Sequence, residues 1–396
     1  MPRDHRSQHP GYPAAAAVFA VGMAGTTLPT PLYGLYRDQL GFSELMVTVV
    51  FAVYALGVIA TLLLAGNVSD DAGRRPVLLC ALAFSAASAL CFLFEGGLVP
   101  LFAGRLLSGL AAGLFSGAAT VTVMELAPPG REGRAGLAAT AANMGGLGCG
   151  PLLAGLLAEY APWPLRLTFV VHLTLVAAAG VLTWFLPETV RHASGRLRLR
   201  PQGLVVPAEV RGVFLPAALA AFAGFALLGL FTAVAPAFAA ETLGVHNLAV
   251  TGAVVFSVFL ASTIGQSLMG RVGVRRGLPG GCFVLVVGLV LVGTSLAVES
   301  LPVLVSGAIC GGLGQGLSFR AAMTAISGAA PPEQRGATVS AFFVAAYVGI
   351  SLPVVGVGAL TLWLGLRGAG LVFTACVMVL ALSAGLYVAR RFATED

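Results

Sequence analysis

The sequence has little charge, because only 10% of its 396 residues are charged while 58% are hydrophobic. A soluble domain carries about 25% charged residues, so this chain has too little polar surface to cover itself in water. Its apolar segments reach the length of about 20 residues that a helix needs to cross a bilayer. The shortage of charge therefore excludes an ordinary soluble protein and predicts an all-α integral membrane protein.

Lysine is missing, and the 22 basic residues are all arginines, which give the chain a net charge of +6. A basic excess occurs in nucleic-acid-binding proteins, but these arginines mostly lie between apolar segments, so we expect no nucleic-acid partner. The lack of lysine also excludes the phosphate loop that ends in Gly-Lys-Ser/Thr. The six cysteines have no metal-ligand spacing, so we expect no metal and no cofactor.

Apolar segments separated by polar residues predict twelve membrane-spanning helices and no separate soluble domain. The polar start of the chain has no signal-peptide cleavage pattern, so the first span is expected to remain in place. The shortest separation lies between the fifth and sixth spans, where only residues 160–163 intervene. The expected spans are 13–35, 44–65, 76–95, 98–124, 136–159, 164–186, 212–239, 247–269, 278–298, 301–327, 337–361 and 367–390.

The arginines are distributed unevenly over the loops between these spans. If both termini lie on one side, that side holds 17 arginines and the other holds Arg37, Arg166 and Arg367. The last two, Arg105 and Arg320, lie within spans. Arginine-rich loops face the cytoplasm, so we expect both termini to be cytoplasmic and the chain to lie in the inner or plasma membrane.

The two halves of the chain repeat each other at offsets of 201 or 202 residues. The repeated pairs are Arg74-Arg75 and Arg275-Arg276, Pro100 and Pro302, and Pro151 and Pro353. Six-helix repeats related by an axis along the membrane normal form transporters with the substrate site between them. We predict one six-helix bundle over residues 1–189, a basic cytoplasmic linker over residues 190–211 and a second, pseudo-symmetric bundle over residues 212–396.

A motif rich in glycine and charge lies in the loop between the second and third spans. Residues 66–75 read Gly-Asn-Val-Ser-Asp-Asp-Ala-Gly-Arg-Arg. The loop resembles the signature of the major facilitator superfamily, with Asp71 where the family usually has a basic residue. A charged turn that obeys the positive-inside tendency is the alternative interpretation. The matching residues are Gly66, Asp70, Gly73, Arg74 and Arg75.

The resemblance implies that this loop is a conformational latch, which stabilises the outward-open state by holding the two halves together on the inside. Its arginines can pair with a carboxylate at a nearby helix end, and Glu125 closes the fourth span on the same side. Asp70 is also suited to a helix N-terminus, where the helix dipole favours negative charge. The second copy of the loop has Arg271 at the acidic position, so only the first half is expected to keep the latch.

Arg105 lies inside the fourth span and is followed by Gly109 and Gly113 at four-residue spacing. A buried arginine costs several kcal/mol, roughly, so it needs a partner or a wet cavity. The alternative is that Arg105 snorkels to the outer surface. The segment resembles the family's fourth-helix motif, which implies a role in proton coupling or substrate handling.

The fifth span contains closely spaced glycines and a proline, which resemble the motif of proton-coupled, twelve-helix drug antiporters in this family. The proline kinks the helix, and the glycines allow close packing. Generic helix packing is the alternative, because 52 glycines are spread over the chain. The motif residues are Gly146, Gly150, Pro151 and Gly155. Pro187-Glu188-Thr189 ends the sixth span as in many family members, although an exposed acid at a helix stop explains it equally well.

Polar side chains within spans must face protein or water. The candidates for a substrate cavity are Thr27, Thr30, Tyr54, Asn143, Gln266 and Tyr347. His172 is a candidate proton carrier, and Arg320 is expected to be a second buried charge, in the half opposite Arg105. Each of these side chains could instead bond to a neighbouring helix. No Asp or Glu lies at the middle of a span, so we expect a substrate that is neutral, zwitterionic or anionic.

These features predict a secondary transporter, not an enzyme, that exports a small amphipathic molecule by alternating access. The proton gradient is the expected energy source, and the transporter is expected to be a monomer in the bilayer. Proton-coupled uptake of a nutrient or metabolite uses the same cycle and stays open as an alternative. A sensor without transport would have lost the latch, and an intramembrane enzyme would need a cluster of His, Asp or Glu.

Overall fold

The computed structural model describes residues 11–66, 68–190 and 203–394. Arg3, Arg6 and residues 191–202 of the expected basic linker lie outside the described residues. The described residues form a bundle of helices, and each expected span coincides with a helical segment to within a few residues. The prediction of an all-α membrane protein is confirmed.

Apart from the segment between α9 and α10, the long helices follow one another with short connections, as the alternation of apolar and polar segments predicts. The connection between the fifth and sixth spans runs from Tyr160 to Leu167, so these two helices are separate. The helices are α1 (Tyr12–Thr27), α2 (Tyr33–Leu40), α3 (Glu44–Ala65), α4 (Val68–Ala72), α5 (Arg74–Leu93), α6 (Leu98–Glu125), α7 (Glu132–Thr140), α8 (Gly146–Tyr160), α9 (Leu167–Phe185), α10 (Arg211–Ala233), α11 (Ala235–Glu241), α12 (Leu248–Val272), α13 (Val274–Val298), α14 (Leu301–Ala329) and α15 (Arg335–Thr394). Short helical turns are η2 (Thr30–Leu32), η3 (Ala141–Gly145) and η4 (Ala208–Val210).

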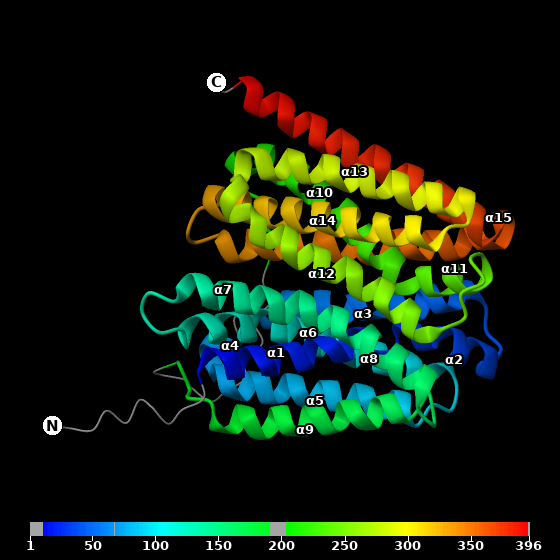
Figure 1. Cartoon of the computed structure of the whole chain (residues 1–396). Coiled ribbons are helices and arrows are strands. Elements are labelled where there is room, and N and C mark those ends of the chain that lie inside the picture. Colours follow the sequence, from blue (N-terminus) through cyan, green and yellow to red (C-terminus); the bar gives the residue numbers. More distant parts are fainter. Residues whose placement is uncertain (1–10, 67, 191–202, 395–396) are drawn as a thin grey trace.

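The described part of the chain contains 11 helical segments that are long and apolar enough to cross a membrane. The last, α15, has 60 residues and a non-helical residue inside it, Gly365, with φ 66° and ψ 173°. Figure 1 shows the chain reversing its direction within α15. Each arm of α15 is as long as a membrane-spanning helix, and the count of twelve spans stays a prediction.

The two halves of the sequence form two adjacent groups of helices, α1–α9 in the lower part of Figure 1 and α10–α15 in the upper part. At one end of the bundle α1 begins, α15 ends and α4 lies; we call this the arginine-rich end. The opposite end holds α2 and α11. The assignment of the arginine-rich end to the cytoplasm stays a prediction.

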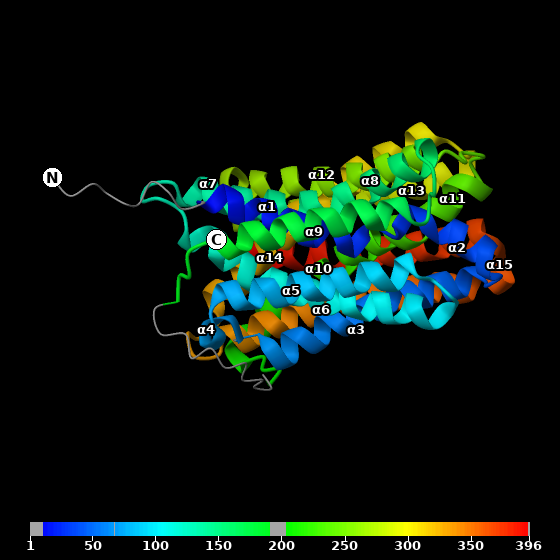
Figure 2. The same cartoon turned by 90° about the horizontal axis from the view of Figure 1, so that it is seen from below.

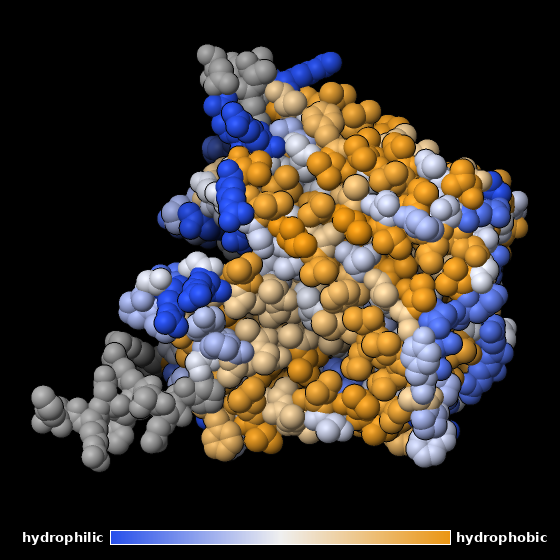
Figure 3. Space-filling model, in the orientation of Figure 1, coloured by the Kyte–Doolittle hydropathy of each residue, from blue (hydrophilic) through white to orange (hydrophobic). Residues whose placement is uncertain are grey.

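The face of the bundle in Figure 3 carries a broad apolar band with hydrophilic residues at both ends. Large hydrophobic side chains such as Leu56, Val181 and Leu352 are more than 60% exposed. A soluble protein does not expose so wide an apolar surface. Helices that satisfy their own backbone hydrogen bonds can place such a surface in lipid.

The sequence repeat extends to backbone conformation at the starts of α5 and α13. Gly73 precedes α5 with φ 103° and ψ 153°, and Gly273 precedes α13 with φ 78° and ψ 162°. Positive φ is open to glycine at little cost. Each glycine is followed within three residues by one of the paired arginines, so the two loops share a turn as well as a charge pattern.

Candidate functional site

The glycines predicted in the fifth span lie on α8 where this helix meets α1 and α12. A Cβ atom at Gly146 would lie 2.6 Å from the Ala20 carbonyl oxygen, and one at Gly150 would lie 2.2 Å from that of Ala24. Gly155 approaches Leu248 of the second half in the same way. These glycines therefore bring α8 into backbone contact with α1 and with the other half.

Pro151 leaves the carbonyl of Leu147 without its helical donor, because proline has no N–H. Thr27 of α1 fills this place, and its Oγ1 donates to the Leu147 carbonyl at 2.6 Å. The preceding turn, η3, is π-helical and carries Asn143. Irregular turns of this kind occur often at functional sites. The kink of α8 is thus held by a hydrogen bond from α1.

A cavity of about 360 Å³ lies between the two halves. We call it the central cavity. Both halves contribute aromatic side chains to its walls, Phe51 and Tyr54 from the first and Phe225, Phe319 and Phe343 from the second. The rings of Tyr54 and Tyr347 meet across the two halves at a centroid distance of 6.2 Å. The predicted residues that line it are Thr27, Tyr54, Arg105, Asn143, Gln266, Arg320 and Tyr347.

Arg105 is buried, with an exposed fraction of 2%. Its Nη1 donates to the Thr26 carbonyl at 2.6 Å and its Nη2 to the Phe51 carbonyl at 3.3 Å. The guanidinium also lies over the Tyr54 ring, 4.8 Å from the centroid, and its Nε has no partner among the described residues. The snorkelling alternative is wrong, because α1 and α3 hold Arg105 inside the bundle.

Arg320 is exposed, so the expectation of a second buried arginine is wrong. It lies at the rim of the central cavity and also lines a wider cavity of about 860 Å³, which we call the vestibule. The vestibule is bordered by Glu132 at the start of α7 and Arg271 near the end of α12. Both lie at the arginine-rich end, and water in the vestibule can hydrate Arg320 there.

The lining of the central cavity carries positive charge without a counter-charge. Arg105 and Arg320 line it, and no Asp or Glu is among the described residues that do so. Both arginines lack a carboxylate partner within the described part of the chain. The expectation of a cavity without a carboxylate therefore agrees with this arrangement.

Thr30 and His172 lie outside this lining. Thr30 lies beyond the end of α1 at Thr27, in the turn η2, where it is buried, and its role in a substrate cavity stays a prediction. His172 of α9 is also buried, and its Nε2 lies 3.1 Å from Ser85 Oγ. It packs against Gly25 of α1. The role of His172 as a proton carrier stays a prediction, at a site away from the cavity.

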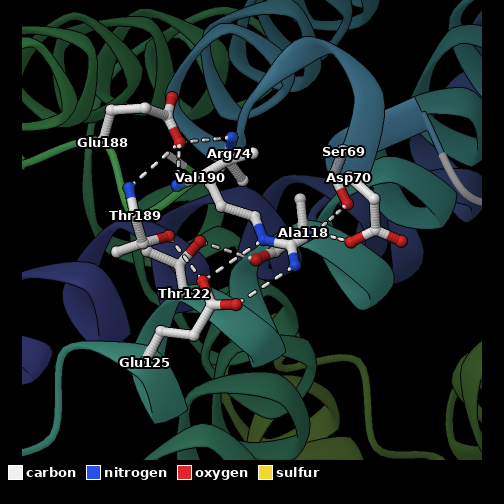
Figure 4. Close-up of polar contacts among 9 residues, drawn as sticks. All are labelled: Ser69, Asp70, Arg74, Ala118, Thr122, Glu125, Glu188, Thr189 and Val190. Atoms are coloured by element: carbon white, nitrogen blue, oxygen red, sulfur yellow. Dashed lines mark hydrogen bonds and ion pairs between the residues drawn. The ribbon is translucent and has the colours of Figure 1, made fainter. Parts of the chain in front are cut away.

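Arg74 lies at the centre of a cluster of polar groups at the arginine-rich end (Figure 4). Its Nη1 lies 2.6 Å from Asp70 Oδ1 and donates to Ser69 Oγ, also at 2.6 Å. Its Nη2 and Nε donate to the two carboxylate oxygens of Glu125 at 3.2 and 3.3 Å. Gly73 allows the turn before Arg74, Gly66 ends α3, and Arg75 stacks on Trp184 at 4.4 Å.

These contacts connect α4, α5 and α6 within the first half. The resemblance implies a contact that holds the two halves together. The contacts that Arg74 makes with described residues all lie within the first half. The structure therefore assembles the expected latch residues on one side of the interface.

Glu188 and Thr189 complete this cluster, and sequence reasoning did not assign them to it. Glu188 accepts from the backbone N–H of Arg74 at 2.8 Å (Figure 4). It also accepts from the backbone N–H of Arg75 at 3.0 Å. It thus caps the N-terminus of α5, the role that Asp70 was expected to suit. Thr189 donates to Glu125. The sequence indicated only that an acidic residue follows the sixth span. It did not indicate which residues this acid contacts.

The end of the bundle opposite the arginine-rich end is closed by contacts between the halves. Arg37 Nη1 lies 2.6 Å from Glu241 Oε1. Glu159 accepts from the backbone N–H of Leu248 at 2.8 Å, and Asn247 donates to Tyr160 at 3.1 Å. At the arginine-rich end the surface is hollowed between two lobes (Figure 3). The central cavity therefore opens toward the arginine-rich end.

The side view in Figure 2 places α9 on the outside of the first half beside α1 and α5. The cavity is lined by other elements: α1, α3, α6, α7, η3 and α8 of the first half, and α10, α12, α14 and α15 of the second. Two groups of helices around a cavity that opens at one end form the architecture of a membrane transporter. The fold and the cavity together define this class, and they indicate a transporter instead of an enzyme.

A family model described as the Major Facilitator Superfamily matches residues 14–277, and the chain belongs to this family. The fold is similar to that of the human organic anion transporter MFSD10 (TETRAN), with a TM-score of 0.67, 17% identity and coverage of 97% of this chain and 100% of that one. It is also similar to a bacterial homologue of the human lysosomal transporter Spinster in an inward-facing, unoccupied conformation, with a TM-score of 0.68, 16% identity and 97% of each chain covered. No match was found among the curated proteins.

Proposed function

We propose that this transporter exports a small amphipathic molecule that is anionic, zwitterionic or neutral, and that proton entry drives the export. The observation that carries the proposal is the charge of the central cavity. Arg105 is buried there without a carboxylate, and Arg320 lies at its rim. A strongly cationic substrate would meet two positive charges and no negative one.

The free-energy cost of burying Arg105 explains why its charge favours an anionic substrate. An unpaired buried charge is strongly unfavourable, and carbonyl contacts and aromatic faces offset only part of that cost. An anionic group of a substrate would supply the missing partner, and the aromatic walls would cover its apolar part. MFSD10, one of the proteins with a similar fold, is described as an organic anion transporter, which supports an anionic substrate.

The direction of transport follows from the expected orientation. If the arginine-rich end is cytoplasmic, the cavity accepts its substrate from the cytoplasm and releases it after the opposite end opens. The antiporter-like motif in α8 supports proton entry as the driving force, with the transporter acting as a monomer in the cell membrane. Proton-coupled uptake is the second candidate, because the same states can be visited in the reverse order.

The test is transport by the purified chain in proteoliposomes with an imposed pH gradient. We expect carboxyfluorescein to move against its own gradient, and ethidium to move little. Arg105→Gln should reduce carboxyfluorescein transport at least ten-fold, while Arg166→Gln, at an exposed site far from the cavity, should leave it unchanged. Ethidium transport that survives Arg105→Gln and Arg320→Gln would contradict the proposed substrate class. Movement of substrate in the same direction as protons would establish uptake.

A further inference from the structure

Three buried polar side chains, Gln266, Ser262 and Gln315, are connected by hydrogen bonds that lead from the central cavity into the second half. Gln266 lines the central cavity and the vestibule. Its Nε2 donates to Ser262 Oγ at 3.4 Å, one turn earlier on α12, and Ser262 Oγ donates to Gln315 Oε1 of α14 at 2.6 Å. Ser262 and Gln315 are completely buried. Only Gln266 reaches the space that a substrate occupies.

Close backbone packing holds Gln315 in one place. A Cβ atom at Gly316 would lie 2.1 Å from the Ser262 carbonyl oxygen, so α12 and α14 are in backbone contact beside the pair. On the other side, a Cβ atom at Gly224 of α10 would lie 2.7 Å from Gln315 Cγ. Gln315 therefore has little freedom to move its amide group.

The direction of these two hydrogen bonds determines what Gln266 offers to the cavity. A serine hydroxyl can donate one hydrogen bond, and Ser262 donates it to Gln315 Oε1. The Ser262 oxygen then accepts from Gln266 Nε2, which fixes the amide of Gln266. Its Oε1 has no partner among the described residues and remains an acceptor on the cavity side.

We propose that Gln266 recognises a hydroxyl or N–H donor on the substrate, and that Ser262 and Gln315 are positioning residues that keep its Oε1 turned toward the cavity. This inference rests on the proposed function, in which Arg105 pairs with an anionic group of the same molecule. The substrate would then carry a negative group at one end and a hydrogen-bond donor at the other.

The positions of the two residues also indicate the length of such a molecule. From the closed end of the bundle, Arg105 lies near the start of α6 and Gln266 lies in the last third of α12. If α6 and α12 begin at the same depth, a rise of about 1.5 Å per residue places the Cα atoms of the two residues roughly 16 Å apart along the bundle axis. Both side chains shorten this gap, which leaves room for a molecule about as long as two linked aromatic rings.

The test is calorimetric titration of the full chain, purified in lipid nanodiscs, with two matched probes. One is para-hydroxy-biphenylcarboxylate and the other is its para-fluoro analogue, which cannot donate a hydrogen bond. For the unmodified chain we expect the hydroxy probe to bind about five-fold more tightly. Gln266→Leu should bring the ratio of the two affinities to about one.

The positioning residues are tested by the same ratio. Gln315→Met removes the acceptor of Ser262, so the hydroxyl can donate to Gln266 Oε1 and occupy it, and the ratio should also fall to about one. Ser262→Ala removes the hydroxyl that fixes the Gln266 amide but leaves Oε1 able to accept, so the ratio should fall only in part. Ser262→Thr, which keeps the hydroxyl, should retain most of the preference. Ser257→Ala is the matched control, because Ser257 bonds only to its own helix at the Val254 carbonyl.

Arg105→Gln separates this inference from the proposed function. It should weaken both probes by the same factor and leave their ratio unchanged, so an unaltered affinity in this variant would count against the anionic substrate alone. The inference about Gln266 is overturned if the ratio stays the same in Gln266→Leu and Gln315→Met. It is also overturned if the unmodified chain binds neither probe or does not distinguish them.

Discussion

Arg37 and Glu241 join the two halves of the protein at the end opposite the arginine-rich end. The Nη1 atom of Arg37 on α2 lies 2.6 Å from Glu241 Oε1 on α11, and Arg37 also pairs with Glu44 of α3. For the cavity to open at this end, α2 and α11 have to separate, and this separation breaks the pair between Arg37 and Glu241.

The first prediction is that Glu241→Gln favours the state that is open at this end. Both side chains are partly exposed, and ion pairs of this kind contribute about 0.2–1 kcal/mol. The ratio of the two states should therefore change by roughly 1.4- to five-fold. Distances between spin labels placed on α2 and α11, measured in nanodiscs, report this ratio.

Asp38→Asn is the matched control for Glu241→Gln. Asp38 also lies near Arg37, at 3.4 Å from its Nε, but it belongs to the same half and is 71% exposed. Its loss should leave the distances between α2 and α11 unchanged. If both variants shift the distances equally, the effect is one of overall charge, and the pair between the halves has no special role.

The second prediction concerns the hydrogen bond that holds the kink of α8. Thr27→Val removes the donor to the Leu147 carbonyl, which Pro151 cannot replace. We expect the free energy of unfolding in mixed micelles to fall by about 1 kcal/mol. Thr174→Val is the control, since the hydroxyl of this exposed threonine bonds to the carbonyl of Val170 in its own helix. Equal losses in the two variants would argue against the α1–α8 bond.

The membrane-spanning helices could be predicted from the sequence because few backbone structures are stable in lipid. An apolar run of about 20 residues satisfies its backbone only as a helix, and Leu98–Glu125 or Leu301–Ala329 needs no tertiary contact to be recognised. The depth of a residue in its span is equally readable: Arg105, which was expected at membrane depth, is buried, and the candidates Asn143 and Gln266 line the central cavity.

The environment of a side chain was harder to predict, because it depends on other helices. Arg320 lies within a span, yet the vestibule beside it makes it exposed. Glu188 follows a helix end like many solvated acids, and its partners at Arg74 and Arg75 are more than 110 residues away in the sequence. The role of Gln315 could not be predicted from its position in the sequence, because it depends on a hydrogen bond from Ser262 of another helix.

The third prediction tests the packing of α8 against α1. In Gly150→Ala the new methyl group would lie 2.2 Å from the Ala24 carbonyl oxygen and 2.7 Å from Thr27 Oγ1. The two helices must move apart, at a cost of about 1–3 kcal/mol in the free energy of unfolding. Gly180→Ala in α9 is the control, because a methyl group there meets no atom within 4 Å and alanine favours a helix by up to about 1 kcal/mol.

The same measurement decides between packing and a general effect of removing glycine from helices. Denaturation in mixed micelles should show a loss for Gly150→Ala and a small gain for Gly180→Ala. A gain in both variants would mean that α1 and α8 tolerate a methyl group between them, and that the close approach at Gly150 is not required.

The fourth prediction concerns the cluster around Arg74. Asp70→Asn and Glu125→Gln each remove one charge that the Arg74 guanidinium contacts, while the shapes of the side chains stay the same. If the cluster sets the balance between conformations, each variant should insert normally and transport at least three-fold more slowly in proteoliposomes. Glu333→Gln is the control, because this exposed carboxylate is not among the residues that line the central cavity or the vestibule. Normal transport by well-inserted Asp70→Asn protein would show that the cluster stabilises the fold of the first half and has no part in the transport cycle.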